Sequence, residues 1–403
     1  GYGFSRQRNG AVNMHAALSI PAVTGAWAYE GGGALHSNSG VYNLKKTLIE
    51  GLDVVDVSTR MLDQSRIGAV LTGEPDALKG GPPVKAMIVQ NTNPMAIAPA
   101  QDKVRRGFLR EDLFVCVHEQ FLTSTARYAD IVLPATMFLE HDDIYTGGGH
   151  QYLQFAAKLI DPPENCRSNH EVVVELARRV GAEHRGFAMS PREIIDWTLR
   201  SSGRGTLAQL ERDRWLDCQP PFEEAHFIDG FGHGDRKFHF RVDWSKVRYP
   251  NDGLKGPWEA MPSLPDHWPS NEEPDAECPF KLATSPARNF LNSTFTETPS
   301  SRAREKRPTL LMNALDADEL GVVSGDVVTL GNSRGRTRLH VEVSDAVGKG
   351  LLVSEGVWPN ECFLDGRGIN TLTSDEPVAP FGGAALHDCK VWAIKASRES
   401  GAP

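Results

Sequence analysis

Three short apolar runs, each followed by polar residues, constrain the fold of this chain most strongly. They cover residues 84–89, 113–117 and 131–134. Helix-like segments at 100–109 and 123–128 separate them. Strand, helix, strand, helix, strand with short connections is the pattern of a parallel sheet with helices on both faces. The sequence therefore predicts an α/β domain that binds its ligand at the carboxyl ends of the strands.

Two further helices are predicted beyond this sheet. Residues 170–180 form an amphipathic pattern, and Ser190 with Glu193 makes a capping box that opens a helix reaching about Arg200. The pattern then weakens, because Pro, Gly and Trp are frequent up to about residue 279. In that stretch we predict only a small hairpin around residues 237–242.

The hydrophobic period changes to two in the last third of the chain. Short strands are predicted at residues 327–330, 336–343, 350–354 and 390–395, and turn residues separate them. Such short, evenly spaced strands predict a compact β-barrel. The predicted domains are an α/β domain over 1–200, an irregular connector over 201–277 and a barrel domain over 278–403.

The composition limits the kinds of partner and cofactor that we expect for this chain. The chain has 403 residues and a formal net charge of −9, which argues against nucleic acid or an anionic membrane surface as its main partner. The strongest apolar run, residues 131–139, is interrupted by Pro134 and is too short to span a membrane. None of the six cysteines forms a C-x2-C pair, so we expect isolated, reduced thiols and no iron–sulfur cluster in this chain.

Two polar loops are candidate ligand sites. Asn91 and Asn93-Pro94 follow the first predicted strand, where amide groups suit a ribose or a base; an ordinary Asn-Pro turn is the alternative. Thr123, Ser124 and Thr125 stand at a predicted helix start, where free N–H groups and hydroxyls would bind a pyrophosphate. A simple helix cap is the alternative there.

Glu140-His141-Asp142-Asp143 could ligate a metal or relay protons. Consecutive residues rarely converge on one point, so solvated loop charges are the alternative. The glycines at 31–33 and 147–149 match neither a nicotinamide fingerprint nor a phosphate-binding loop. A nucleophilic serine elbow is also missing from the sequence.

Taken together, the motifs resemble the molybdopterin oxidoreductases related to dimethyl sulfoxide reductase, biotin sulfoxide reductase and formate dehydrogenase. The carrying segments are Asn93-Pro94, the run Phe121-Leu122-Thr123-Ser124-Thr125-Ala126-Arg127-Tyr128-Ala129-Asp130-Ile131-Val132-Leu133-Pro134, Glu140-His141, Asn313-Ala314-Leu315-Asp316-Ala317 and Gly368-Ile369-Asn370-Thr371-Leu372-Thr373. The resemblance covers the whole chain and is weakest between residues 201 and 277. It implies a Rossmann-like parallel-sheet domain followed by a six-stranded, double-psi-type β-barrel.

The resemblance also implies a cofactor, bis-molybdopterin guanine dinucleotide carrying molybdenum or tungsten, whose dithiolene sulfurs suit these soft metals. The residues expected to bind it are Gly3, Asn91, Asn93, Pro94, Glu119, Thr123, Asp130, Glu140, His141, Thr284, Ser293, Thr294, Asn313 and Asn370. Arg6 matches a segment near the metal and is the candidate for a catalytic role that does not involve binding the metal. The resemblance assigns no metal ligand to this chain.

Relatives carry another half-protein before the equivalent of Gly1, with the metal ligand and commonly a [4Fe-4S] motif. We therefore expect a fragment, an incomplete gene or one half of a split enzyme, inactive alone. Its expected partners are that other half, an electron-transfer subunit or redox protein, and a small-molecule substrate. The expected location is the cytoplasm, with the periplasm left open.

The expected function is two-electron oxidoreductase chemistry, either oxo transfer or formate-type oxidation. The alternative is a non-catalytic relative that serves as an electron-transfer scaffold, like the large iron–sulfur subunit of respiratory complex I. A scaffold would not need Asn93-Pro94, Thr123 and Asn370 together, which favours a cofactor-binding protein. A sugar-nucleotide or thiamine-diphosphate protein would need phosphate or metal motifs that the sequence lacks.

Overall fold

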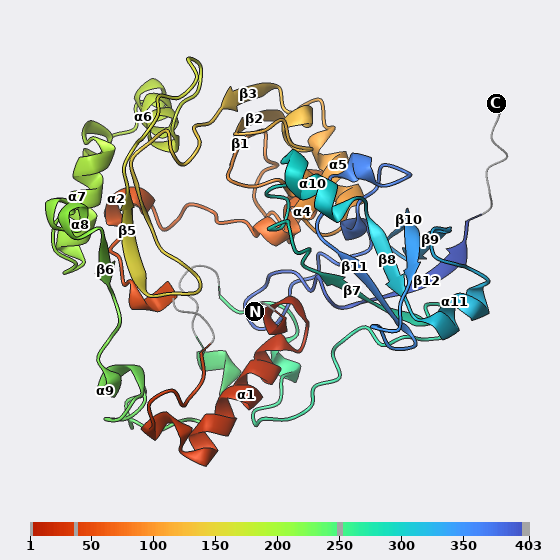
Figure 1. Cartoon of the computed structure of the whole chain (residues 1–403). Coiled ribbons are helices and arrows are strands. Elements are labelled where there is room, and N and C mark those ends of the chain that lie inside the picture. Colours follow the sequence, from red (N-terminus) through yellow and green to blue (C-terminus); the bar gives the residue numbers. More distant parts are fainter. Residues whose placement is uncertain (1–2, 36–38, 248–252, 397–403) are drawn as a thin grey trace.

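The computed structural model describes residues 3–35, 39–247 and 253–396 (Figure 1). The predicted first residue of the α/β domain, Gly1, and the predicted last residue of the barrel domain, Pro403, lie outside these ranges. The described residues form a three-stranded parallel sheet, a three-stranded antiparallel sheet and a closed six-stranded barrel. The predicted fold class, an α/β domain followed by a six-stranded barrel, is confirmed.

The parallel sheet has the order β1-β2-β3. Its strands are β1 (Ala86–Gln90), β2 (Phe114–Glu119) and β3 (Ile131–Pro134). The first crossover contains α4 (Pro94–Ile97) and α5 (Gln101–Phe108), and α5 packs against α3 (Ile67–Thr72). The helix predicted over residues 123–128 is reduced to a 3-10 turn, Ala126–Tyr128, because the connection from β2 to β3 is short.

The antiparallel sheet was not predicted from the sequence. It contains β4 (Asp143–Tyr145), β5 (Tyr152–Ala156) and β6 (Trp215–Asp217), and β6 comes from the segment expected to be irregular. The helices beside it are α6 (Asn169–Val180), α7 (Pro191–Ser201) and α8 (Leu207–Asp213), with the short α2 (Thr47–Glu50) nearby (Figure 1). The capping box predicted at Ser190 and Glu193 is present at the start of α7.

The hairpin predicted around residues 237–242 is wrong, because the structure has no strand there. Aromatic packing replaces strand pairing: the ring of Phe238 stacks on His15 of α1 (Gly10–Thr24) with ring centroids 6.1 Å apart. The ring of Trp244 meets the same histidine edge-on. The short helix α9 (Phe222–Ala225), which precedes these residues in the chain, also lies beside α1 (Figure 1).

The barrel closes in the order β10-β8-β11-β7-β12-β9. Its strands are β7 (Phe280–Ser285), β8 (Thr309–Met312), β9 (Val327–Asn332), β10 (Gly335–Val343), β11 (Leu351–Glu355) and β12 (Cys389–Lys395). Two short helices, α10 (Pro299–Glu305) and α11 (Ala314–Leu320), connect strands. The four strands predicted in this region are confirmed, whereas β7 and β8 were missed. Fully buried Leu282, Leu310, Leu330 and Leu352 fill the centre of the barrel.

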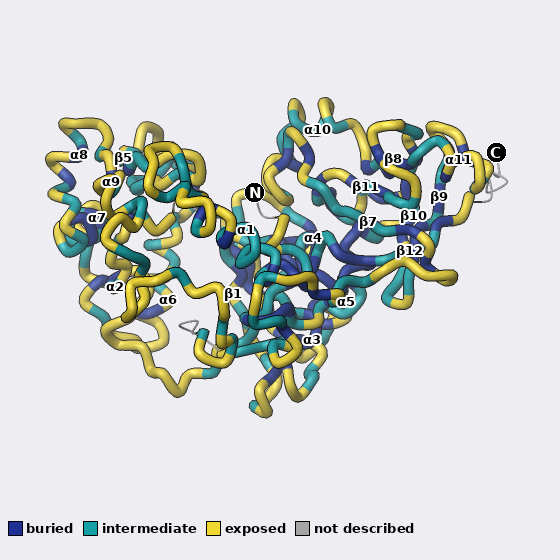
Figure 2. The backbone as a smooth tube through the Cα atoms, turned by 90° about the horizontal axis from the view of Figure 1, so that it is seen from below, coloured by how far each residue is buried: buried dark blue, intermediate teal, exposed yellow. Residues whose placement is uncertain are grey.

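The two ends of the barrel differ in what they contact. At one end, which we call the docking end, β7 and β11 finish while β8 and β12 begin. Asn360 and Asn370, from loops at this end, donate hydrogen bonds to the carbonyl oxygens of Met95 and Ala96 in α4, at 2.6 and 3.0 Å. Figure 2 shows buried backbone concentrated in the barrel and around α4. The barrel is therefore fixed directly against the segment that leaves β1.

In the described part of the chain, the helices are all too short or too polar to cross a membrane.

Candidate functional site

The residues after β1 form the first part of the candidate site. Asn91 has a left-handed backbone with φ of +56°, a conformation that Asn tolerates better than most residues. Its side chain is exposed and has no hydrogen-bond partner among the described residues. Both polar atoms of the Asn91 amide are therefore available to a ligand.

Asn93 is differently placed. Its side chain is buried, and its Oδ1 accepts hydrogen bonds from the backbone N–H and the hydroxyl of Thr125, at 3.1 and 2.7 Å. The Thr125 hydroxyl in turn accepts from the N–H of Met95. Asn93 thus joins the loop after β1 to the loop after β2, and Pro94 beside it is buried as the first residue of α4. Their predicted contact with a guanosine remains a prediction.

A buried histidine, His118, connects the strands that precede these two loops to a third segment of the chain. His118 Nε2 donates to the carbonyl oxygen of Arg167, because a carbonyl can only accept. Its Nδ1 therefore accepts from the side-chain amide of Gln90, 2.9 Å away. His118 thus links the ends of β1 and β2 to the segment before α6. No pattern in the sequence indicates this role.

The end of β2 supplies a carboxylate. Glu119 is half-buried, and one of its oxygens accepts from the N–H of Gln120. The carbonyl oxygen of Glu119 accepts from the N–H of Ala135, so the end of β3 lies against it. Thr123, in the loop that follows, uses its hydroxyl to accept from the N–H of Ala126. Glu119 retains a second carboxylate oxygen for a ligand.

His141 belongs to the same edge of the sheet. Its Nδ1 lies 2.8 Å from the hydroxyl of Thr136, whose carbonyl oxygen accepts from the side chain of Gln120. Glu140 instead accepts from the N–H of Met137 and closes a turn. Asp142 accepts from the N–H of Lys158. The predicted cluster over residues 140–143 therefore faces several partners and does not converge on one point.

The prediction that Asp130 shares a site with Glu119 is wrong. Asp130 precedes β3, and its carboxylate accepts from the N–H of Val115 near the start of β2, at 2.7 Å. Val115 and Glu119 are four positions apart along the strand, which is roughly 13 Å at about 3.3 Å per residue. Asp130 thus lies at the amino ends of the strands, opposite the loops of Asn91 and Glu119.

The docking end of the barrel gathers a second group. The Thr284 hydroxyl donates to the carbonyl oxygen of Leu386 at 2.8 Å, so it must accept from Nδ1–H of His387, 3.0 Å away. The N–H of His387 donates to the carbonyl oxygen of Arg6. Burial lowers the pKa of His387, and the charge of Arg6 lowers it further, so the ring is neutral near pH 7 with Nε2 unprotonated.

The loop that leaves β7 carries Ser293 and Thr294. Thr294 is exposed, and Ser293 is half-buried with its carbonyl oxygen accepting from Thr296. Gly3 starts the 3-10 turn Phe4–Arg6, which brings Arg6 to this end of the barrel. Hydroxyl and guanidinium groups therefore lie around the docking end, while Asn370 is buried and bonded to α4.

The prediction that Asn313 joins this group is wrong. Asn313 follows Met312, which pairs with Leu352, whereas Thr284 pairs with Ser354 at the other end of β11. Its Oδ1 caps α11 by accepting from Leu315, and its Nδ2 donates to the carbonyl oxygen of Val347. Asn313 is thus a helix cap at the barrel end opposite the docking end.

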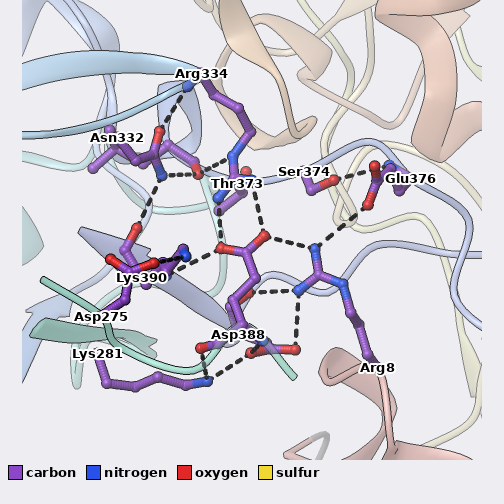
Figure 3. A network of polar contacts seen from close by, with 12 residues as sticks. Arg8, Asp275, Lys281, Asn332, Arg334, Thr373, Ser374, Glu376, Asp388 and Lys390 are labelled. Atoms are coloured by element: carbon purple, nitrogen blue, oxygen red, sulfur yellow. Dashed lines mark hydrogen bonds and ion pairs between the residues drawn. The ribbon is translucent and has the colours of Figure 1, made fainter. Parts of the chain in front are cut away.

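A buried ionic network holds Arg8, which lies just before α1, against the docking end (Figure 3). The guanidinium of Arg8 bonds Asp388 at 3.0 Å and Glu272 at 2.8 Å. Glu272 also accepts two hydrogen bonds from Arg334, and Asp388 accepts one from Lys281. These residues were not predicted, because no local pattern joins positions so far apart. The network fixes the backbone two residues after Arg6.

Two family models match the chain. The molybdopterin oxidoreductase model matches residues 1–179, and the molydopterin dinucleotide binding domain model matches residues 280–390. The chain belongs to the molybdopterin oxidoreductase family. The predicted family is thereby confirmed, and the two matches contain the strand-end loops and the docking end of the barrel.

Similar proteins of known sequence point to the same family. "Probable oxidoreductase YoaE" of Bacillus subtilis is 33% identical over 97% of this chain and 55% of its own length. "Dimethyl sulfoxide reductase DmsA" of Escherichia coli is 25% identical over 94% of this chain and 50% of its own length. The chain thus spans about half the length of these curated relatives. The fold is also that of acetylene hydratase from Pelobacter acetylenicus, with a TM-score of 0.63 at 19% identity over 83% of this chain and 47% of that protein.

The donor set suits the family's dinucleotide cofactor. Asn91 and Glu119 offer an amide and a carboxylate acceptor at the strand ends, which match the hydroxyls and N–H groups of a nucleoside. Arg6, Ser293 and Thr294 offer positive charge and hydroxyls at the docking end, which match phosphate and pterin oxygens. Among the described residues, no group of three His, Cys, Asp or Glu side chains could hold a metal ion.

Proposed function

We propose that this chain holds the dinucleotide arm and covers the pterin of a molybdenum or tungsten bis(pyranopterin guanine dinucleotide) oxidoreductase. The observation that carries the proposal is the direct docking of the barrel on α4, through Asn360 and Asn370. This contact brings the polar groups of the docking end next to the strand-end loops. A ligand as long as a dinucleotide could then contact both.

The residues at the strand ends and at the docking end would have different roles in binding the cofactor. Asn91 and Glu119 would orient the nucleoside, and Glu119 would accept from its N–H or O–H groups. Arg6, held by its backbone bond to His387, would place a positive charge beside the pterin. The bound metal–dithiolene unit would supply the two-electron chemistry itself. The protein's contribution is to bind, orient and exclude water.

Oxo transfer is the reaction we favour over formate-type oxidation. Relatives matching most of the chain include a dimethyl sulfoxide reductase and a trimethylamine-N-oxide reductase, and both names describe reduction of an oxide. We further propose that catalysis needs protein segments beyond those in this chain. An electron-transfer subunit or redox protein would supply electrons, and the cytoplasm is the proposed location.

The test is metal and pterin analysis of the purified protein from a host supplied with molybdate and tungstate. Elemental analysis should find molybdenum or tungsten, and oxidised extracts should show pterin fluorescence. Reduced-viologen assays with dimethyl sulfoxide, trimethylamine N-oxide, nitrate and formate, run on the chain together with the further segments that catalysis is proposed to need, would then identify the substrate class. A folded protein without metal or pterin would favour the electron-transfer scaffold instead.

A further inference from the structure

A cavity of about 570 Å³ opens between the α/β domain and the barrel, beside the contact of Asn360 with Met95. Its walls come from the start of α5, from the 3-10 turn after β2 and from barrel residues 360–371. None of Asn91, Glu119, Thr284 or Arg6 lines it. Ser124, from the loop predicted to bind a pyrophosphate, does line it, so the cavity adjoins that loop but does not include the four residues just named.

Three guanidinium groups from three elements line this cavity. Arg105 comes from α5, Arg127 from the turn after β2 and Arg367 from the barrel. Neither Arg105 nor Arg127 has an ion pair or a side-chain hydrogen bond with any described residue, and both are exposed. Arg367 pairs with Asp102 at 3.3 Å. Two of the three positive charges therefore lack a protein counter-ion.

Three carboxylates, Asp102, Glu361 and Asp365, line the first cavity beside its three guanidinium groups, and Asp365 accepts from the backbone N–H of Arg367 at 3.4 Å. Asp102 is the partner of Arg367, and Glu361 accepts from the hydroxyl of buried Ser124 at 3.3 Å. A second cavity, of about 530 Å³, shares Asp365 and Arg367 with the first. It adds Arg336 and further basic side chains, so positive groups outnumber negative ones across the pair. This excess is notable on a chain whose formal charge is −9.

Guanidinium groups approaching from several directions suit a tetrahedral oxyanion. Each can donate two parallel hydrogen bonds to neighbouring oxygens of a phosphate, and such charge-assisted bonds are roughly twice as strong as neutral ones. Met95 and Tyr128 add apolar surface to the lining. The cavity is larger than one phosphate group, so it has room for an organic substituent.

We propose that this interdomain cavity binds a phosphate group, either free or as a small monoester, between Arg105, Arg127 and Arg367. An anion there would bridge α5 and the turn after β2 to the barrel. It would stabilise the docked arrangement of the two domains. The three arginines have no part in the proposed function, so failure of this proposal would leave that function untouched.

The experiment is calorimetric titration of the full chain with inorganic phosphate and, separately, with phenyl phosphate, at constant ionic strength set with chloride. Binding should be saturable, and the monoester should bind more tightly because it also covers Met95 and Tyr128. The double variant Arg105→Gln with Arg127→Gln should weaken binding by about tenfold or more. Arg106→Gln is the matched control, because Arg106 neighbours Arg105 on α5 and is exposed but lines neither cavity.

Thermal unfolding provides the second measurement. Phosphate should raise the melting temperature of the wild-type chain and of Arg106→Gln but not that of the double variant, while all three melt alike in chloride alone. The proposal is overturned if neither phosphate compound binds the wild-type chain. It is equally overturned if the double variant binds both as tightly as Arg106→Gln does.

Discussion

Asp388, whose side chain is fully buried, forms an ion pair at 3.0 Å with Arg8, 380 positions earlier in the chain. Lys281 approaches the same carboxylate at 2.7 Å. Breaking a buried pair by neutralising one partner leaves charges without compensation. The contact therefore ties the first helical segment to the barrel, and it predicts where the chain is most sensitive to substitution.

Asp388→Asn should lower the free energy of unfolding by about 3 kcal/mol, because Arg8 and Lys281 then lose a buried counter-ion. Urea unfolding followed by circular dichroism measures this loss. Glu319→Gln is the control: its pair with Lys349 is exposed, so it should cost less than about 1 kcal/mol. Equal effects of the two substitutions would refute the structural importance of the buried network.

Glu272 should make stability depend on pH. Burial raises the pKa of this carboxyl, but the hydrogen bonds and charge of Arg334, with smaller contributions from Lys390 and Arg8, outweigh burial and hold the pKa below its usual 4.5. A depressed pKa adds stability above the unfolded value, and that stability is lost as the pH falls through the folded pKa.

The stability difference between the wild type and Glu272→Gln should therefore be constant from pH 7 to about pH 5 and should shrink below about pH 4.5. Urea unfolding of both proteins across this range gives the difference directly. A difference that stays the same down to pH 3 would contradict the assignment.

Asn93 and Thr125 should be energetically coupled, because the two hydrogen bonds between them are buried. Asn93→Ala leaves the N–H of Thr125 unpaired and should cost about 1–3 kcal/mol. A double-mutant cycle with Thr125→Ala should give a coupling free energy of about 1 kcal/mol. Additive effects would mean that the two loops are stabilised independently.

The cysteines should differ in reactivity. Burial raises the pKa of Cys389 to about 12, so its thiolate is scarce and inaccessible in the folded chain. Cys166 is more exposed. A disulfide exchange reagent should therefore label Cys166 in the native protein and Cys389 only after unfolding, as peptide mapping can show. Loss of the fast reaction in Cys166→Ser is the expected control result.

Local patterns in the sequence predicted the elements whose signal is contained in a few residues. The strands β1 to β3 follow from apolar runs between polar loops, and the start of α7 follows from Ser190 and Glu193. The strands β4 and β6 have three residues each, too few to show an alternation. Their existence depends on pairing with β5, which only the folded chain reveals.

Prediction of the candidate site from the sequence has the same limit. Loops directly after strands, such as those of Asn91 and Glu119, could be placed at one edge of the sheet from the sequence. Asp130 and Asn313 could not, because the end of a strand at which a residue lies depends on register and chain direction. The pairing of Arg8 with Asp388 has no local signal at all, since it depends on the barrel closing.

Cofactor content tests most directly whether the strand-end loops hold the cofactor's dinucleotide. Molybdenum, tungsten and pterin should be measured per folded protein in the wild type, in Asn91→Ala with Glu119→Gln, and in Asp130→Asn. We predict full content in the wild type and in Asp130→Asn, which lies at the opposite end of the sheet, and a strong loss in the double variant. Equal content in the double variant and Asp130→Asn, or no pterin in the wild type, would contradict the account.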